Sequence, residues 1–229
     1  MSTYRFASRQ QLDRQLTARV AKVLASDITE TGWAILVVSG GRTPRDLFHA
    51  LSRAEIDWAR VWITLADERW IDGEHADSNQ RLVRDNLCIE RAAAARFVAL
   101  KNSAISAYQG QSDCAKALAT LGRFSMVLLG MGDDGHTASL FPGAADLARG
   151  LDLDSGIDCL AITPPQASHQ RITLSLPRLL NSRQIVVHIV GAAKSELLAQ
   201  VQAGRDVYEY PVRGILQQSK AAVDIFYAD

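Results

Sequence analysis

The chain has 229 residues, of which 48% are hydrophobic and 22% are charged, and its 25 Lys and Arg residues balance its 25 Asp and Glu residues. This length suits one sizeable α/β core, and the neutral balance argues against nucleic-acid binding, which normally requires a basic excess. The N-terminus lacks the apolar segment of a signal peptide, and no apolar run approaches the roughly 18 residues of a membrane helix. We therefore expect a single domain over residues 1–229, in a soluble cytoplasmic protein with no nucleic-acid or membrane partner.

The first half of the chain alternates helical and strand patterns. Apolar residues recur at helical spacing over 12–24, which predicts an amphipathic helix. The continuous apolar run over 33–38 is typical of a buried parallel strand, and a second such strand is predicted over 61–66. After the first strand, Thr43 and Pro44 predict an N-cap and a first helical residue. Asp77-Ser78 predicts the cap of the next helix.

The second half continues the alternation, with one helix predicted over 106–121 and another over 192–201. The predicted strands are 126–130, 172–176, 185–190 and 221–227. Strands that alternate with helices along the chain indicate an α/β fold, with a mainly parallel sheet covered by helices on both faces. No linker or repeat divides the chain.

Four polar segments follow predicted strands, where ligands bind in open α/β sheets. They are SGGRTP (39–44), ADERW (66–70), GDDGHTASLFPG (132–143) and GAAK (191–194). Because the carboxyl ends of parallel strands meet at one edge of the sheet, we expect these segments to form one site.

The segment SGGRTP is suited to phosphate. Gly40 and Gly41 allow backbone N–H groups to approach a ligand closely, and the helix that follows adds unpaired donors. The alternative is an ordinary tight turn between a strand and a helix. The lysine of a P-loop is missing, so the segment is not a nucleotide-binding loop of that type.

Three cations adjoin predicted strand ends. Arg69 and Arg171 each offer a planar fork for phosphate oxygens, although many arginines simply lie in solvent. Lys194 occupies the first turn of a predicted helix, where a cation opposes the helix dipole unless an anion compensates it. The polar loop that ends at Asn79 either binds sugar hydroxyls or only connects two elements.

The loop after the strand at 126–130 carries the strongest candidate for chemistry. GMGDDG matches the G-x-G-x-x-G pattern of dinucleotide sites, but Pro142-Gly143 soon interrupts the helix that such a site requires. In the same loop His136 is a candidate general base, because imidazole takes up a proton near neutral pH. Asp134 is close enough in a turn to orient its ring. His188, inside an apolar strand, is expected to be a hydrogen-bonded core residue.

Neither a metal site nor a disulfide framework is predicted. Cys88, Cys114 and Cys159 lie far apart in the sequence, and no C-x-x-C pair or Cys/His cluster is present. Near His136, the only other ligand types are Asp133 and Asp134, with no second histidine at a suitable spacing. We therefore expect no metal.

Taken together, the motifs resemble the glucosamine-6-phosphate isomerase/6-phosphogluconolactonase family. SGGRTPRDLF, ADERW followed by HADSN, LLGMGDDGHTASLFPG, RITLSLPRLL and VGAAK occur in the order that this family shows, over roughly residues 37 to 214. The resemblance implies a three-layer Rossmann-like fold and no metal or organic cofactor. The implied substrate is a sugar lactone that carries a 6-phosphate.

The resemblance also assigns roles by matching position. Gly40, Gly41 and Thr43 would form the phosphate loop, with Arg171 and Lys194 as its cationic partners. His136 would be the general base, with Asp134 beside it. The further implied site residues are Asp67 and Arg69, which would face the sugar or lactone end, and Asn79 and Gly135, which lie in the same motifs.

The lactonase branch of the family fits best. The deaminase branch places a glutamate five residues after its loop histidine, where this chain has Phe141. The implied reaction is hydrolysis of 6-phospho-D-glucono-1,5-lactone to 6-phospho-D-gluconate in the oxidative pentose phosphate pathway, with His136 activating water. An amino-sugar-phosphate isomerase or deaminase, or a non-catalytic sugar-phosphate-binding module, are the alternatives.

Overall fold

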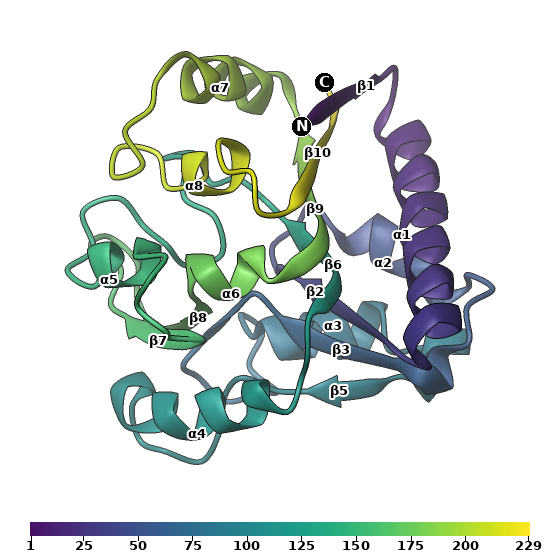
Figure 1. Cartoon of the computed structure of the whole chain (residues 1–229), viewed down its shortest axis with the longest axis horizontal. Helices are drawn as coiled ribbons and strands as arrows, with labels where there is room; N and C mark the ends of the chain where they lie inside the picture. The colour runs from purple at the N-terminus through teal and green to yellow at the C-terminus, as the bar shows by residue number, and fades with distance from the viewer.

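The computed structural model describes residues 1–229, and its centre is a sheet of seven strands (Figure 1). In the order of the sheet, the strands are β1 (Ser2–Phe6), β10 (Ala222–Ala228), β9 (Ser182–Val190), β6 (Phe124–Leu129), β2 (Ala34–Val38), β3 (Val61–Leu65) and β5 (Arg96–Val98). Every neighbouring pair is parallel. All residues of β2 and β6 are buried, as expected for strands covered on both faces. The predicted parallel sheet is confirmed.

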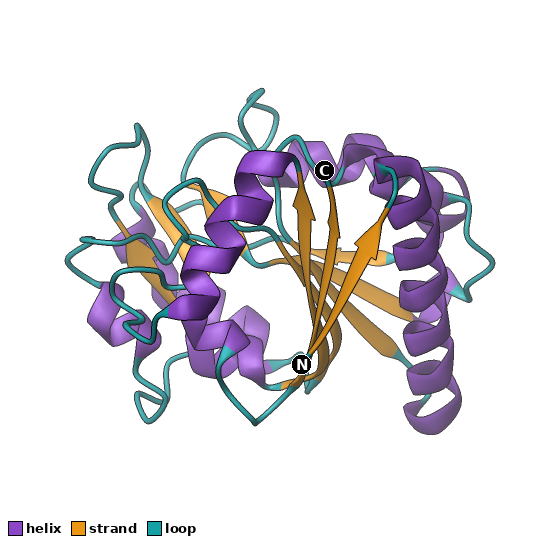
Figure 2. Cartoon of the chain, turned by 90° about the horizontal axis from the view of Figure 1, so that it is seen from above, coloured by secondary structure: helices purple, strands orange, loops and turns teal.

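Helices lie on both sides of this sheet (Figure 2). They are α1 (Arg9–Thr31), α2 (Arg45–Ser52), α3 (Asn79–Asn86), α4 (Ala107–Ala119), α5 (Leu147–Leu151), α6 (Leu176–Leu180), α7 (Ala192–Ala203) and α8 (Arg213–Leu216), with 3-10 turns at Trp58–Arg60 and Glu90–Ala94. The predicted apolar stripe of α1, which includes Leu12 and Val20, is buried in a core shared with the sheet. None of the helices has both the length and the apolar character needed to cross a bilayer.

A second, antiparallel sheet was not predicted. It contains β4 (Asp67–Arg69), β8 (Arg171–Leu174) and β7 (Cys159–Ile162), with Arg69 directly opposite Arg171. The strand predicted over 172–176 is therefore present, but it belongs to this sheet and ends earlier. It ends because the Ser175 side chain accepts a hydrogen bond from the Arg178 backbone N–H and so caps α6.

The two predicted helix caps have different outcomes. Ser78 caps α3, and its hydroxyl accepts a hydrogen bond from the Arg81 backbone N–H, as predicted. The prediction of Thr43 as a cap was wrong by one residue, because Pro44 occupies the cap position of α2 and no side chain bonds there. The Thr43 carbonyl instead accepts a hydrogen bond of 2.9 Å from the Arg9 guanidinium of α1.

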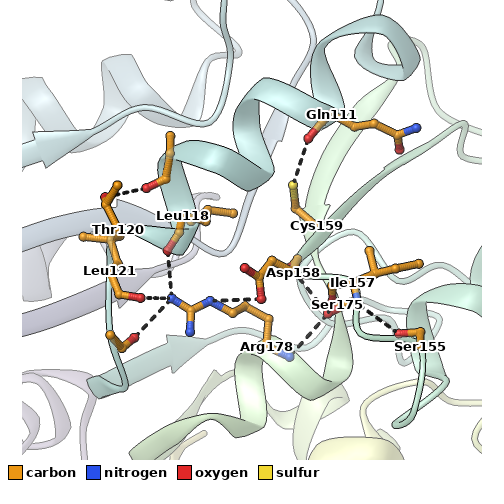
Figure 3. Close-up of polar contacts among 12 residues, drawn as sticks. Gln111, Leu118, Thr120, Leu121, Ser155, Ile157, Asp158, Cys159, Ser175 and Arg178 are labelled. Atoms are coloured by element: carbon orange, nitrogen blue, oxygen red, sulfur yellow. Dashed lines mark hydrogen bonds and ion pairs between the residues drawn. The ribbon is translucent and has the colours of Figure 1, made fainter.

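The motif RITLSLPRLL contains a buried arginine with a structural task (Figure 3). Nη2 of Arg178 lies within hydrogen-bond distance of the carbonyls of Leu118, in the last turn of α4, and of Leu121 and Gly122, just after it. The guanidinium also lies 4.1 Å from the ring centroid of Phe124. Burial lowers the pKa of Arg178, and nearby Asp158 opposes that shift. Arg178 thus fastens α6 to the carbonyl end of α4.

Candidate active site

A cavity of about 430 Å³ opens where the carboxyl ends of β2, β6 and β9 meet β4. Its volume is typical of small-molecule sites. Each of the four segments that the sequence singled out contributes residues to the lining. Of the predicted site residues, those that line the cavity are Gly40, Gly41, Thr43, Asp67, Arg69, Asn79, His136 and Lys194. Asp134, Gly135 and Arg171 lie outside the lining.

The loop between β2 and α2 requires both of its glycines. A Cβ atom on Gly40 would lie 1.8 Å from Oδ1 of Asn79, so this close approach is open only to glycine. Gly41 has φ +96°, a left-handed conformation that glycine adopts without strain. Gly40 thus brings the backbone of the loop against the side chain of Asn79, which also lines the cavity.

His136 and Asp134 form a short hydrogen-bonded pair. Nδ1 of His136 lies 2.5 Å from Oδ1 of Asp134, and the same oxygen accepts from the His136 backbone N–H at 3.1 Å. Burial alone would raise the pKa of Asp134, but the hydrogen bond and charge of His136 outweigh burial and lower it. Because an ionised carboxylate only accepts, the bond requires the ring proton on Nδ1 and leaves Nε2 as the basic atom.

The surroundings of His136 fix its position. A Cβ atom on Gly132 would lie 2.1 Å from Nδ1 of His136, so the imidazole packs directly on this glycine. The Gly132 backbone N–H donates to the His136 carbonyl at 2.8 Å, which closes the loop. On another side, the ring of Phe141 lies 4.3 Å from that of His136, centroid to centroid. The position that carries glutamate in the deaminase branch is therefore an apolar contact of the base.

Two of the three predicted cations, Arg69 and Lys194, line the cavity, and Arg171 lies beside Arg69 outside the lining. Nζ of Lys194, in the first turn of α7, lies 2.7 Å from the Met131 carbonyl and 2.6 Å from Oδ1 of Asp133. Arg69 donates a hydrogen bond to the Asp77 carbonyl. The neighbouring Arg171 is buried and donates to the His169 carbonyl at 2.8 Å. Burial, followed by the charge of Arg69, lowers the pKa of Arg171.

Comparison with known proteins agrees with this geometry. Residues 7–224 match the family model described as glucosamine-6-phosphate isomerases/6-phosphogluconolactonase. A 6-phosphogluconolactonase of Rhizobium meliloti is 39% identical over 224 residues, covering 97% of each chain. The chain belongs to this family. One of Pseudomonas putida is 37% identical, covering 99% of this chain and 93% of its own. A crystal structure of a 6-phosphogluconolactonase from Shewanella baltica superposes with a TM-score of 0.98 at 43% identity, covering 100% of this chain and 98% of that one.

Membership of this family does not by itself test the predicted roles of single residues, so these stay predictions. The structure brings the glycine loop, the His136 pair and Lys194 around one cavity. It places Arg171 behind Arg69, as a buried neighbour. Gly135 has φ +73°, and its lack of a Cβ leaves room for the ring of Tyr210.

Two residues in the family motifs were missed by the sequence analysis. Ser139 is buried, and its hydroxyl donates to Oδ2 of Asp67 at 2.5 Å. The backbone N–H of Ser139 donates to the Thr173 hydroxyl at 3.1 Å. Ser139 lies three residues after His136 in the same loop, so this loop also fixes the position of Asp67. That shared loop is the only sequence signal that points to this contact.

Glu68 is the second missed residue. Its buried carboxylate accepts hydrogen bonds from the backbone N–H groups of Arg69, Asn79 and Gln80 and from the Ser78 hydroxyl. Burial raises the pKa of Glu68, although the three backbone hydrogen bonds oppose that shift. A carboxylate at the start of α3 is also favoured by the helix dipole. Glu68 therefore fixes Asn79 relative to β4.

His188 is buried as expected, but it is not a satisfied core residue. It lines the cavity, and its buried Nε2 lies 3.5 Å from Oδ1 of Asp13 in α1, with no hydrogen bond on either atom. Burial, with a further contribution from Arg9, lowers the pKa of His188 to about 4. Burial raises the pKa of Asp13 to about 6, and Arg9 opposes that shift.

Metal binding was tested against the same geometry. No group of three or more His, Cys, Asp or Glu side chains is placed to hold a metal ion. In the cavity, His136 is bound to Asp134, and Asp67 is bound to Ser139. These carboxylates are therefore already committed to protein partners, and the prediction of a metal-free reaction needs a direct test.

Proposed function

We propose that this chain hydrolyses 6-phospho-D-glucono-1,5-lactone to 6-phospho-D-gluconate, the activity for which its relatives are named. The observation that carries the proposal is the hydrogen bond between Asp134 and His136, which fixes a base in a cavity. The lining also holds Gly40, Gly41 and Lys194, which suit an anionic group. The predicted cytoplasmic location and the oxidative pentose phosphate pathway belong to the same proposal.

In the proposed mechanism, Nε2 of His136 removes a proton from water as the water oxygen attacks C1 of the lactone. The negative charge that develops on the carbonyl oxygen is stabilised by a donor such as Arg69. The tetrahedral intermediate then collapses, the bond between C1 and the ring oxygen breaks, and protonated His136 returns the proton to that oxygen. Asp134 stabilises the imidazolium that forms between the two steps.

The glycine loop and Lys194 have a different role, because they contact the substrate away from the reacting carbon. We assign them to the 6-phosphate, which lets binding energy from the phosphate orient the ester carbonyl. Asp67 and Asn79 are fixed by Ser139 and Glu68, which makes them suitable partners for sugar hydroxyls.

The purified chain should be assayed with freshly prepared lactone, by following acid release in weak buffer. The background hydrolysis of the lactone is subtracted with a sample that holds buffer and lactone but no enzyme. Enzyme-dependent acid release supports the proposal. A parallel assay for ammonia release from glucosamine 6-phosphate tests the deaminase alternative. If the chain binds 6-phosphogluconate but turns over neither substrate, the remaining alternative is that it is a non-catalytic sugar-phosphate-binding module.

A full incubation with chelator belongs to the same experiment. The water-activation scheme needs only His136 and Asp134, so activity should survive removal of divalent cations. Loss of activity that a divalent ion restores would replace this scheme with a metal-activated hydroxide.

A further inference from the structure

The ammonium of Lys194 is already partnered. β6 and β9 are parallel neighbours, so the loop after β6 and the first turn of α7 lie side by side. Lys194 reaches across to this loop, where it contacts the Met131 carbonyl at 2.7 Å and the Asp133 carboxylate at 2.6 Å. The side chain of Lys194 is 23% exposed, whereas that of Asp133 is 95% exposed.

Asp133 differs from the other acidic residue of the lining. Asp67 is buried and held by Ser139, so it forms part of a rigid wall. Asp133 makes no polar contact besides Lys194 and lies almost entirely in solvent. Its neighbour Asp134 is engaged by His136, and the loop is closed by backbone hydrogen bonds. The Asp133 side chain is therefore free to move without disturbing the base.

We propose that Asp133 is an affinity-determining residue that competes with the substrate phosphate for Lys194. This inference rests on the proposed function, because it takes the Lys194 end of the cavity as the phosphate seat. A phosphate that reaches the ammonium has either to displace the Asp133 carboxylate or to bind beside it against its negative charge. Both routes weaken binding of any phosphorylated ligand, substrate and product alike.

The size of the effect follows from exposure. An ion pair with one partner in solvent contributes little, up to about 1 kcal/mol, and 1 kcal/mol corresponds to about fivefold in affinity. We therefore expect Asp133 to weaken phosphate binding by roughly two- to fivefold. Because the contribution is the same for ground state and transition state, it should change KM and leave kcat unaltered.

The test compares wild type with Asp133→Asn by titration calorimetry with inorganic phosphate at pH 8, where the dianion dominates. The variant should bind phosphate about two- to fivefold more tightly, and its affinity should fall more steeply with added salt. The matched control is Asp154→Asn, an exposed aspartate that does not line the cavity and should leave the affinity unchanged. The thermal midpoint of each variant verifies folding.

A double-mutant cycle gives the decisive comparison. In a Lys194→Met background, Asp133→Asn should no longer tighten phosphate binding, because the competition concerns this one ammonium. Unchanged or weaker phosphate binding in Asp133→Asn overturns the inference, as does phosphate binding to neither protein. The lactonase assay of the wild type is read separately. A wild type that hydrolyses the lactone while Asp133→Asn gains no affinity retains the proposed function and loses only this inference.

Discussion

Arg178 and Lys194 are cations in two regions of the same α/β fold. They differ in the groups of the protein that contact their charged ends. Arg178 is 5% exposed and is engaged by three carbonyls and by Asp158 (Figure 3). Its guanidinium also lies over the ring of Phe124. Lys194 has one carbonyl and one carboxylate that lies in solvent. A buried cation that the protein surrounds with its own carbonyls holds the fold, whereas one with an exposed, replaceable partner can bind a ligand.

The largest effect is expected at His136. Replacing it with Gln should lower kcat by about 10²–10⁴-fold, the usual scale for the loss of a general base, while ligand binding persists. Steady-state kinetics with the phosphorylated lactone measure the effect. His49→Gln, an exposed histidine of α2 outside the cavity lining, is the control and should behave as wild type. Near-normal turnover of His136→Gln would remove this residue from the mechanism.

Replacing Arg178 with Met should act on stability instead. Three buried carbonyls near the end of α4 lose their donor, so the free energy of unfolding should fall by about 3 kcal/mol. Urea unfolding measures this change, and Arg149→Met, an exposed arginine of α5, should change it by less than about 0.5 kcal/mol. The activity of the folded fraction should be normal. A change in KM without a loss of stability would contradict the structural role.

Replacing Lys194 with Met should lower kcat/KM by about ten- to a hundredfold with the phosphorylated lactone, because one charge-assisted contact to the phosphate is lost. Unphosphorylated gluconolactone, a weaker substrate from the start, should be affected far less. Lys22→Met, at an exposed position of α1, controls for the loss of charge. Equal losses with both substrates would move Lys194 to the carbonyl end of the site.

The smallest effect is the net change that pH produces in the wild type through Asp13 and His188, a buried pair whose facing Oδ1 and Nε2 atoms make no hydrogen bond. The pKa of His188 is lowered to about 4, so its contribution to stability is lost as pH falls from 6.5 towards 4. The pKa of Asp13 is raised to about 6, so its contribution has the opposite sign, growing as pH falls from 6 towards 3.8. Between pH 4 and 6, the changes in the free energy of unfolding that the two groups cause therefore largely cancel in the wild type.

In His188→Gln only the Asp13 contribution remains, so the free energy of unfolding of this variant should rise as pH falls from 6. The difference between wild type and variant then isolates the contribution of His188. The stability of wild type minus that of the variant, from urea unfolding, should decrease on acidification from pH 6.5 towards 4, by at most about 1.4 kcal/mol per pH unit. His49→Gln, which changes an exposed histidine, should give a flat difference over the same range. A flat difference for His188→Gln would mean that His188 is not held neutral in the folded state.

Much of the fold could be predicted because parallel strands leave a local trace in the sequence. The run around Val37 is continuously apolar and the run around Val187 is interrupted only by His188, since both faces of these strands are covered. Of the second sheet, only β8 was predicted as a strand, and neither β4 nor β7 was. Asp67–Arg69 is short and polar, and it becomes a strand only because β8 lies beside it. Pairing partners so far apart in sequence cannot be read from periodicity.

The part of the candidate site that could be predicted is the part that residue type and position in a loop after a strand reveal. Gly40, His136 and Lys194 were found because each follows a strand that ends at the same edge. Ser139 and Glu68 were missed, because their importance comes from the hydrogen bonds that they make to Asp67 and Asn79. Their positions in the sequence do not reveal these bonds. The single-domain prediction and the individual site roles were not tested by the family comparison and stay predictions.

The pairing of β1 with β10 has a consequence for the order of folding. Ser2 lies opposite Asp224, so the first strand to be synthesised has no partner in the sheet until nearly the last strand has emerged. Closing so long a loop is slow, and local pairs such as β2 and β3 can form much earlier. We expect β1 to dock last and to open first in hydrogen exchange. During synthesis on the ribosome, the apolar side of β1, including Phe6, would stay exposed to solvent until β10 has emerged and Phe226 can pack against it.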